Sequence, residues 1–125
     1  MSDGELAERL RGRAASLVVP FPSAAHKQVS FDRAELRSIL DLYARKVAEG
    51  EWRDYAIDFT RDKAIFSVFR RTSEIPLYRI EKDPKLARRQ GAYAVVAASG
   101  LVLKRGHELT RVLRVLDTPL RVVSN

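Results

Sequence analysis

The residues best suited to chemistry in this chain are the arginines and lysines of its second half. Residues 70–125 carry twelve basic and five acidic side chains, whereas residues 1–30 carry four and three, and residues 31–69 carry seven and eight. The net charge of +7 is therefore concentrated in the last segment. The planar guanidinium of arginine can hold a phosphate or a carboxylate through two parallel hydrogen bonds. This distribution predicts a surface that binds an anion, although it is equally typical of a basic surface that meets only water.

Ten cations are candidates for that surface, because they fall at predicted strand ends, at turns, around a short helix or on the polar side of the last helix. If folding brings them together, they could displace the counterions of a nucleic-acid backbone and bind it with a steep salt dependence. The sequence contains no motif that would present side chains to base edges. The candidates are Arg70, Arg71, Lys82, Lys85, Arg88, Arg89, Lys104, Arg105, Arg111 and Arg114.

The sequence contains little that an enzyme would need. The absence of cysteine excludes disulfides, thiolate metal sites and a cysteine nucleophile. His26 and His107 are the only histidines, and neither belongs to a short metal-ligand spacing. Asp54 and Asp58 alternate with apolar residues, as exposed strand positions do, and Asp83 is explained as a helix cap. We therefore expect no catalytic residue, no metal and no cofactor.

A phosphate-binding loop is also absent, since residues 100–106 (GLVLKRG) lack the order of glycine, lysine and hydroxyl residues that such loops require. Lys104 and Arg105 nevertheless lead into a predicted helix, whose free backbone N–H groups could face the same anion as these two side chains. Any basic turn before a helix has this property, so the signal is weak.

The elements that must position these residues begin with a helix over residues 32–49. Asp32 is a good N-cap, and Glu35 three residues later has the spacing of a capping box. Apolar residues then recur at helical spacing until Gly50 ends the pattern. The outer face of this helix carries charges of both signs, as solvated helices do.

Residues 54–59 and 64–69 alternate in the manner of a β-hairpin. Placing Phe59 opposite Ala64 puts six side chains on one face, as a buried face requires, and the second strand should be central or covered on its reverse. The six side chains belong to Tyr55, Ile57, Phe59, Ala64, Phe66 and Val68.

The second half of the chain completes an α+β fold. We expect a third strand over residues 76–82, a short helix near 84–90 introduced by Asp83-Pro84, and a final helix over 107–117. Residues 92–103 fit two strands that meet at a glycine turn, or a partly helical segment. The prediction is a mostly antiparallel sheet of about five strands, with the helices 32–49 and 107–117 packed on one face.

The length of 125 residues is enough for one domain, which we place at residues 29–118. Residues 119–125 form a short C-terminal tail. Residues 1–28 form an N-terminal tail in which we expect disorder, although 17–22 (LVVPFP) could dock as an extended strand on a neighbour or on the domain itself. The acidic start does not fit a secretory signal, and no stretch is long enough to span a bilayer, so the cytoplasm is the expected location.

Three blocks of sequence, EWRDYAIDF, FSVFRRTSEIPLYRIEK and KLARRQGAYAVVAASGLVLKRGHEL, resemble a family of short bacterial proteins that is known only as a domain of unknown function. The resemblance covers about residues 29–118 and transfers no activity, cofactor or catalytic residue. It implies a stand-alone bacterial protein.

The sequence thus favours a binding domain over an enzyme. Our leading hypothesis is that the arginine-rich second half holds nucleic acid or another polyanion. The alternative is an interaction or regulatory module that docks an acidic protein, and the third is a small enzyme that uses surface carboxylates. We expect no association with membranes, and the sequence does not indicate an oligomeric state.

Overall fold

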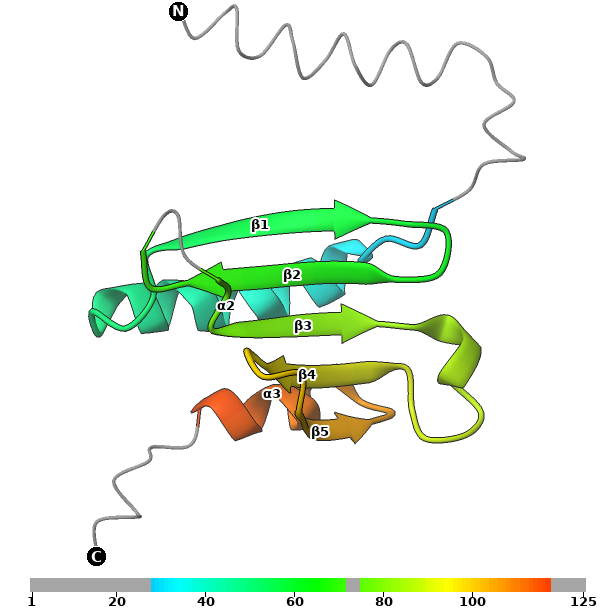
Figure 1. Ribbon diagram of the computed structural model, residues 1–125. Coiled ribbons are helices and arrows are strands. Elements are labelled where there is room, and N and C mark those ends of the chain that lie inside the picture. Colours follow the sequence, from blue (N-terminus) through cyan, green and yellow to red (C-terminus); the bar gives the residue numbers. More distant parts are fainter. Residues whose placement is uncertain (1–27, 72–74, 118–125) are drawn as a thin grey trace, which may run out of the picture.

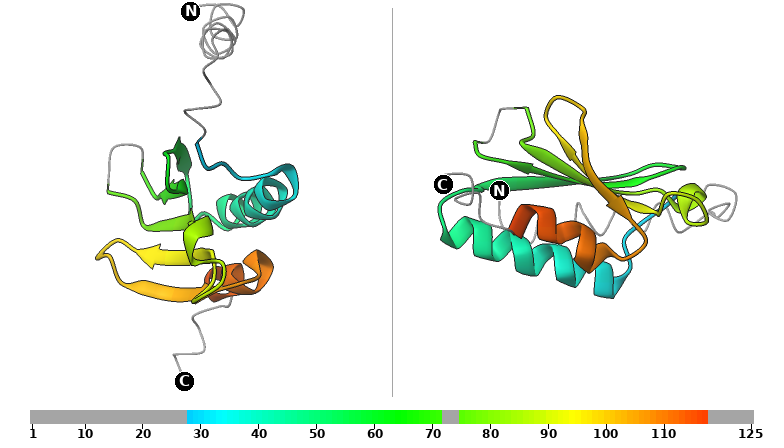
Figure 2. Two further views of the ribbon diagram at one scale, coloured as in Figure 1. Left: turned by 90° about the vertical axis from the view of Figure 1, so that its right-hand side faces the viewer. Right: turned by 90° about the horizontal axis from the view of Figure 1, so that it is seen from below.

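The computed structural model describes residues 28–71 and 75–117, which form an antiparallel sheet with two helices on one face (Figure 1). The strands pair in chain order, each one antiparallel to the next. Both helices lie behind the sheet in Figure 1, and the views of Figure 2 show them together on one side of it. The predicted fold class is confirmed. The elements are α2 (Arg33–Ala48), β1 (Asp54–Phe59), β2 (Ala64–Phe69), β3 (Tyr78–Lys82), β4 (Tyr93–Ala97), β5 (Val102–Gly106) and α3 (Leu109–Asp117).

The first helix forms as its sequence predicts. The Asp32 carboxylate accepts a hydrogen bond from the Glu35 N–H at 2.8 Å, and the Glu35 carboxylate accepts one from the Asp32 N–H at 2.8 Å. These bonds satisfy backbone donors that the helix itself leaves unpaired. Gly50 follows the helix with a φ of 78°, a conformation that favours glycine. Ile39 and Leu42 point into the core and are buried.

The β1–β2 hairpin has the predicted register, from Tyr55 opposite Val68 to Phe59 opposite Ala64. Its burial differs from the prediction, because Tyr55 and Phe59 are 41% and 42% exposed while Phe66 on β2 is fully buried. The reason is that β1 is an edge strand, and the helix layer leaves its outer part uncovered. Strand β2 lies between β1 and β3, as its two apolar faces indicate.

The short helix expected near residues 84–90 is only a single 3₁₀ turn, Pro84–Leu86. Asp83 caps it as predicted, since its carboxylate accepts a hydrogen bond from the Lys85 N–H at 3.2 Å. The helix does not continue because Gly91, at a φ of 114°, turns the chain back and donates its N–H to the carbonyl of Leu86 at 2.9 Å.

Residues 92–103 form strands and not a helix, with the turn at Gly100, whose φ is 97°. The final helix starts at Leu109 and not at residue 107. The carbonyl of Glu108 is the first to accept a helical hydrogen bond, which the Val112 N–H donates at 3.1 Å.

The core lies between the sheet and the helices. Phe66, Ile80 and Val95 on the three central strands are fully buried, and α3 packs directly over β4 and β5. Among the described residues, no helix is long and apolar enough to cross a membrane. Both predicted tails lie outside the described residues apart from residue 28, so the limits of the domain stay a prediction.

Candidate anion-binding surface

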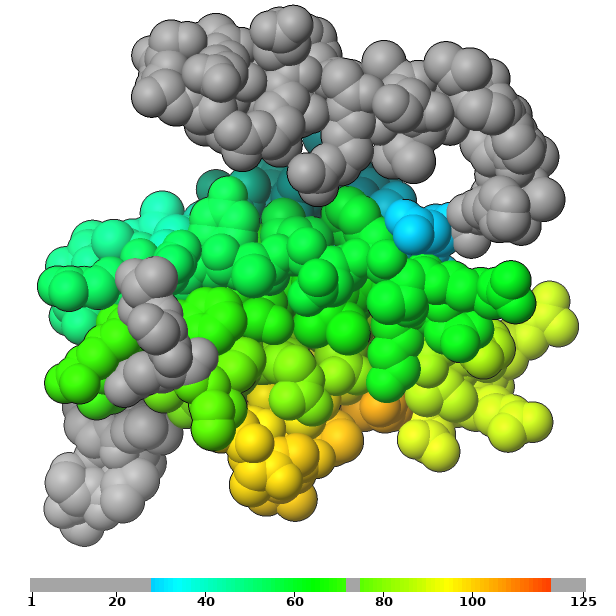
Figure 3. Space-filling model, turned by 45° about the horizontal axis from the view of Figure 1, so that its top comes forward, coloured from blue at the N-terminus to red at the C-terminus, as the bar shows by residue number. Residues whose placement is uncertain are grey.

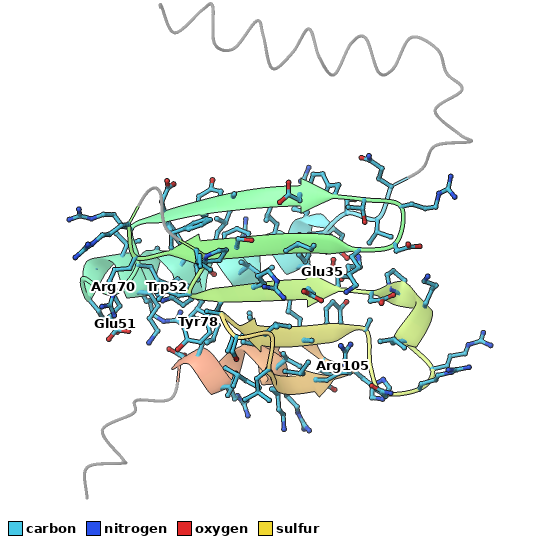
Figure 4. The ribbon with its side chains drawn as sticks, in the orientation of Figure 1. Glu35, Glu51, Trp52, Arg70, Tyr78 and Arg105 are labelled. Atoms are coloured by element: carbon cyan, nitrogen blue, oxygen red, sulfur yellow. The ribbon has the colours of Figure 1, made fainter. Side chains whose placement is uncertain are left out.

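The ten candidate cations do not converge on one surface. Arg70 and Arg71 follow the end of β2, and Figure 4 shows Arg70 and Arg105 near opposite ends of the sheet. Because each strand runs antiparallel to the one before it, β2 and β5 end at opposite ends of the sheet. Side chains at these two ends could bind one nucleic-acid strand only if that strand crossed the whole sheet. The site must therefore be sought in a subset of the ten.

Lys82 is a structural residue and not a free cation. Its Nζ lies 2.7 Å from Oε1 of Glu35 and donates to the carbonyl of Ser30 at 2.9 Å. The Lys82 and Glu35 side chains are only 19% and 11% exposed. The hydroxyl of Tyr93 donates a further hydrogen bond to Glu35, and burial followed by this bond raises the pKa of Tyr93. This network ties the start of α2 to β3 and β4.

Two other candidates form ion pairs that are exposed to water. Lys85 lies 3.1 Å from the carboxylate of Asp62, and Arg111 lies 3.1 Å from that of Glu108. In both pairs each side chain is more than half exposed. Exposed pairs contribute at most about 1 kcal/mol, so a ligand could replace either carboxylate.

The closest grouping of candidates lies between β5 and α3. Lys104, Arg111 and Arg114 line a shallow hollow of about 410 Å³ together with Val115. Lys104 is directed there because it pairs with the buried Val95 and so shares the face of the sheet that α3 covers. The two arginines lie three residues apart on α3, which places them on the same side of the helix.

Arg105 points to the opposite face of the sheet from Lys104, because consecutive strand residues alternate. Its guanidinium donates to the carbonyl of Gly91 at 3.3 Å. The prediction that Lys104 and Arg105 could face the same anion at the start of the last helix is therefore wrong, since only Lys104 lies beside α3.

The loop that carries Arg88 and Arg89 packs against the end of β5. A Cβ added to Gly91 would lie 2.2 Å from the carbonyl carbon of Gly106, a separation that no side chain tolerates. This contact joins the loop, β5 and α3 into one side of the molecule, on which residues 84–117 carry seven basic and two acidic side chains. We call this edge of the molecule the basic flank. It comprises Lys104, Arg111 and Arg114 around the hollow, Arg105 on the opposite face of β5, and Arg88 and Arg89 on the loop.

The described residues offer an enzyme no evident centre. They contain no group of three or more histidine, aspartate or glutamate side chains that could hold a metal ion. His107 is exposed. A cleft of about 270 Å³ between α2 and α3 is lined by Asp41 and Asp117, but the carboxylate of Asp117 is bound to Arg45 at 2.9 Å.

The face of the sheet that neither α2 nor α3 covers carries an ionic cluster around a buried glutamate, which the sequence did not reveal. Glu81 is 6% exposed and lies 3.1 Å from Nζ of Lys63 and 3.2 Å from Nε of Arg79. Strand alternation could have placed Glu81 and Arg79 on the same face, but the pairing with Lys63 depends on the neighbouring strand. The cluster has two cations for one carboxylate, and none of its members belongs to the loop, β5 or α3 of the basic flank.

The model of a family described as "Protein of unknown function (DUF2794)" matches residues 29–113, which is more than half of the chain. The chain belongs to this family. No curated protein and no solved structure matches the DUF2794 chain. Since the family description names no activity, the function has to be argued from the surface.

Proposed function

We propose that this DUF2794 protein is a binding domain that holds a polyanion, in the first place nucleic acid, against its basic flank. The observation that supports this most directly is the hollow shared by Lys104, Arg111 and Arg114. The three cations extend from a strand and a helix that pack against each other, so their backbone positions are fixed before a ligand arrives. Preorganisation of this kind lowers the entropy cost of binding.

The charge distribution supports the same proposal. Residues 84–117 carry an excess of five basic side chains, whereas residues 31–69, which include α2 and β1, carry one more acid than base. A field of one sign on one side of a small domain steers a negatively charged chain to that side. Because phosphates bind mainly through charge, the interaction should weaken steeply as salt is raised.

The experiment measures binding of a labelled duplex and a labelled single strand across a salt series. The test variant carries Lys104→Glu, Arg111→Glu and Arg114→Glu, and the matched control carries Arg33→Glu, Arg37→Glu and Arg53→Glu, three exposed arginines elsewhere on the domain. We expect the test variant to lose binding. When one of the three cations is replaced by a neutral residue, the slope of the logarithm of the binding constant against the logarithm of the salt concentration should fall in magnitude by about 0.9 for each duplex phosphate contact removed. Weak binding without salt dependence, or equal loss in the control, would refute the proposal.

Purification from cell extract with and without nuclease separates nucleic acid from an acidic protein. A partner that stays bound after nuclease treatment would make the basic flank a protein-docking surface. From the absence of cysteine and the family resemblance, we further infer that the protein works in the cytoplasm of a bacterium.

A further inference from the structure

The two helices cover the sheet unevenly. One side of α2 faces α3, where Ser38, Leu42 and Arg45 line the cleft between them. The opposite side of α2 carries an apolar stripe that continues past the core toward the edge strand β1. The stripe consists of Leu36, Leu40, Tyr43 and Val47.

The stripe of α2 and the helix-facing side of β1 form one apolar surface. The ring of Tyr43 lies edge-on to that of Tyr55, with centroids 5.0 Å apart. Val47, Tyr55 and Phe59 are each about two-fifths exposed. A shallow hollow of about 420 Å³ lies beside Leu36 and Leu40, and its other lining residues are the charged Arg33, Arg37 and Asp41. Figure 3 shows the green surface of β1 and β2 adjoining the cyan surface of α2 along this edge.

We call this surface the α2–β1 flank. Its apolar side chains come from two elements that meet at Tyr43 and Tyr55, whereas the exposed residues Leu101 to Leu103 lie at one strand end. Exposed apolar surface that is shared between elements generally marks a site where something binds. Its members are Leu36, Leu40, Tyr43, Val47, Tyr55, Ile57 and Phe59.

The described chain begins at one end of this flank. The N–H of Val29 donates to the carbonyl of Thr60, just beyond β1, at 2.9 Å, and the Val29 side chain packs against the core. Four residues later α2 starts. Val29 therefore lies between the end of β1 and the start of α2.

We infer that residues 17–22 (LVVPFP) dock onto the α2–β1 flank of their own chain. All six residues are apolar, and they are joined to residue 28 by only five residues. Five to six extended residues reach about 20 Å, whereas the stripe from Leu36 to Val47 is about 16 Å long. The segment can therefore lie anywhere along the flank.

Two physical arguments favour this occupant over a second copy of the protein. A short tether gives the segment an effective concentration in the millimolar range, and its two prolines reduce the entropy that docking removes. A dimer through this flank would bring Asp54 and Asp58 of both β1 strands to one edge, where like charges repel.

The experiment uses the full chain, into which one cysteine is introduced for a nitroxide spin label, since the natural chain has none. Val19→Cys places the label in the docking segment, and Leu6→Cys is the matched control outside it. With label at position 19 we expect broadening of the amide signals of Val47, Tyr55 and Phe59, but not of Leu101 to Leu103 on β5. Adding Val18→Asp and Phe21→Asp should abolish that broadening, because the charges cannot be buried.

A mixed sample separates the two occupants. Spin-labelled protein without ¹⁵N is added to unlabelled ¹⁵N protein, so that broadening can arise only between molecules. Docking within one chain predicts sharp signals in this sample. Broadening in the mixed sample at the α2–β1 flank, equal broadening from position 6, or no broadening at the flank at all would each overturn the inference.

Discussion

The helix layer of this protein ends in two different ways. On the basic flank α3 closes over β4 and β5, buries Leu109, Val112, Leu113 and Leu116, and leaves its cations outside. On the α2–β1 flank no described helix lies beside α2, and apolar side chains remain in contact with water. One end of the layer is thus complete and charged, and the other is incomplete and apolar. This difference is the basis of the two proposals, which assign a charged ligand to the complete end and an apolar segment to the incomplete one.

The junction of loop and strand on the basic flank should give the largest effect. Gly91→Ala places a Cβ against the backbone of Gly106 and imposes a positive φ on alanine. We expect the free energy of unfolding to fall by about 4 kcal/mol, the sum of backbone strain and overpacking. Gly100→Ala, where nothing lies within 4 Å, is the control and should cost about 1.5 kcal/mol. Equal losses in urea denaturation would show that the Gly91 contact does not matter.

Matched truncations on the two helices test the difference in coverage. Leu113→Ala removes a leucine that is 6% exposed, and we expect a loss of about 3 kcal/mol. Leu40→Ala removes a half-buried leucine from the apolar stripe, and the loss should be about 1 kcal/mol because less apolar area is returned to water. Denaturant midpoints of the two variants measure the difference. The value for Leu40 counts only the cover that the described residues provide, and docking of residues 17–22 would raise it. A loss at Leu40 above that at Leu113 would contradict the difference in coverage.

The carboxylate of Glu35 links the start of α2 to Lys82 on β3 and to Tyr93 on β4. Glu35→Ala leaves Lys82 and Tyr93 without their common partner and removes half of the capping box. We expect a loss of about 2 kcal/mol, below the cost for a fully buried pair because the charges keep some contact with water. Asp117→Ala, which breaks the exposed pair with Arg45, should cost less than about 1 kcal/mol. Thermal unfolding at neutral pH distinguishes the two.

The smallest effect should appear only in alkali. Because the pKa of Tyr93 in the fold lies above its unfolded value of about 10, the neutral hydroxyl contributes stability that is fully present below pH 10 and is lost as the pH rises further. Tyr93→Phe should therefore flatten the fall in stability above pH 10. Part of the fall should remain, since burial, and then the charge of Asp54, also raise the pKa of Tyr43. Unfolding midpoints between pH 9 and pH 11 provide the measurement, and an unchanged slope would contradict the role of Tyr93.

Local signals in the sequence were sufficient for much of the fold. The capping box of Asp32 and Glu35 lies within four residues, and the hairpin register follows from strict alternation on both sides of one turn. Such features depend on neighbours along the chain, which a sequence displays directly. The length of the 3₁₀ turn was not predictable in this way, because it depends on the packing of Gly91 against Gly106.

The candidate site was less predictable because its geometry depends on residues that are far apart in the chain. Lys82 looked like one more cation beside a short helix, but its partner Glu35 lies 47 residues earlier in the chain. Strand alternation could have separated Lys104 from Arg105, yet only the placement of α3 decides which of them meets Arg111 and Arg114. The exposure of Tyr55 and Phe59 likewise depends on where α2 lies across the sheet.

The pairing of every strand with its neighbour along the chain has a consequence for synthesis. A sheet built from successive hairpins can assemble in the order in which a ribosome releases it, because each strand pairs with the strand made just before it. Lys104, however, meets its two companion arginines only when the last helix has emerged and turned back onto β5. A nascent chain that has completed its first four strands therefore holds most of its core but lacks the hollow, so the proposed capacity to retain a polyanion would be the last property to mature.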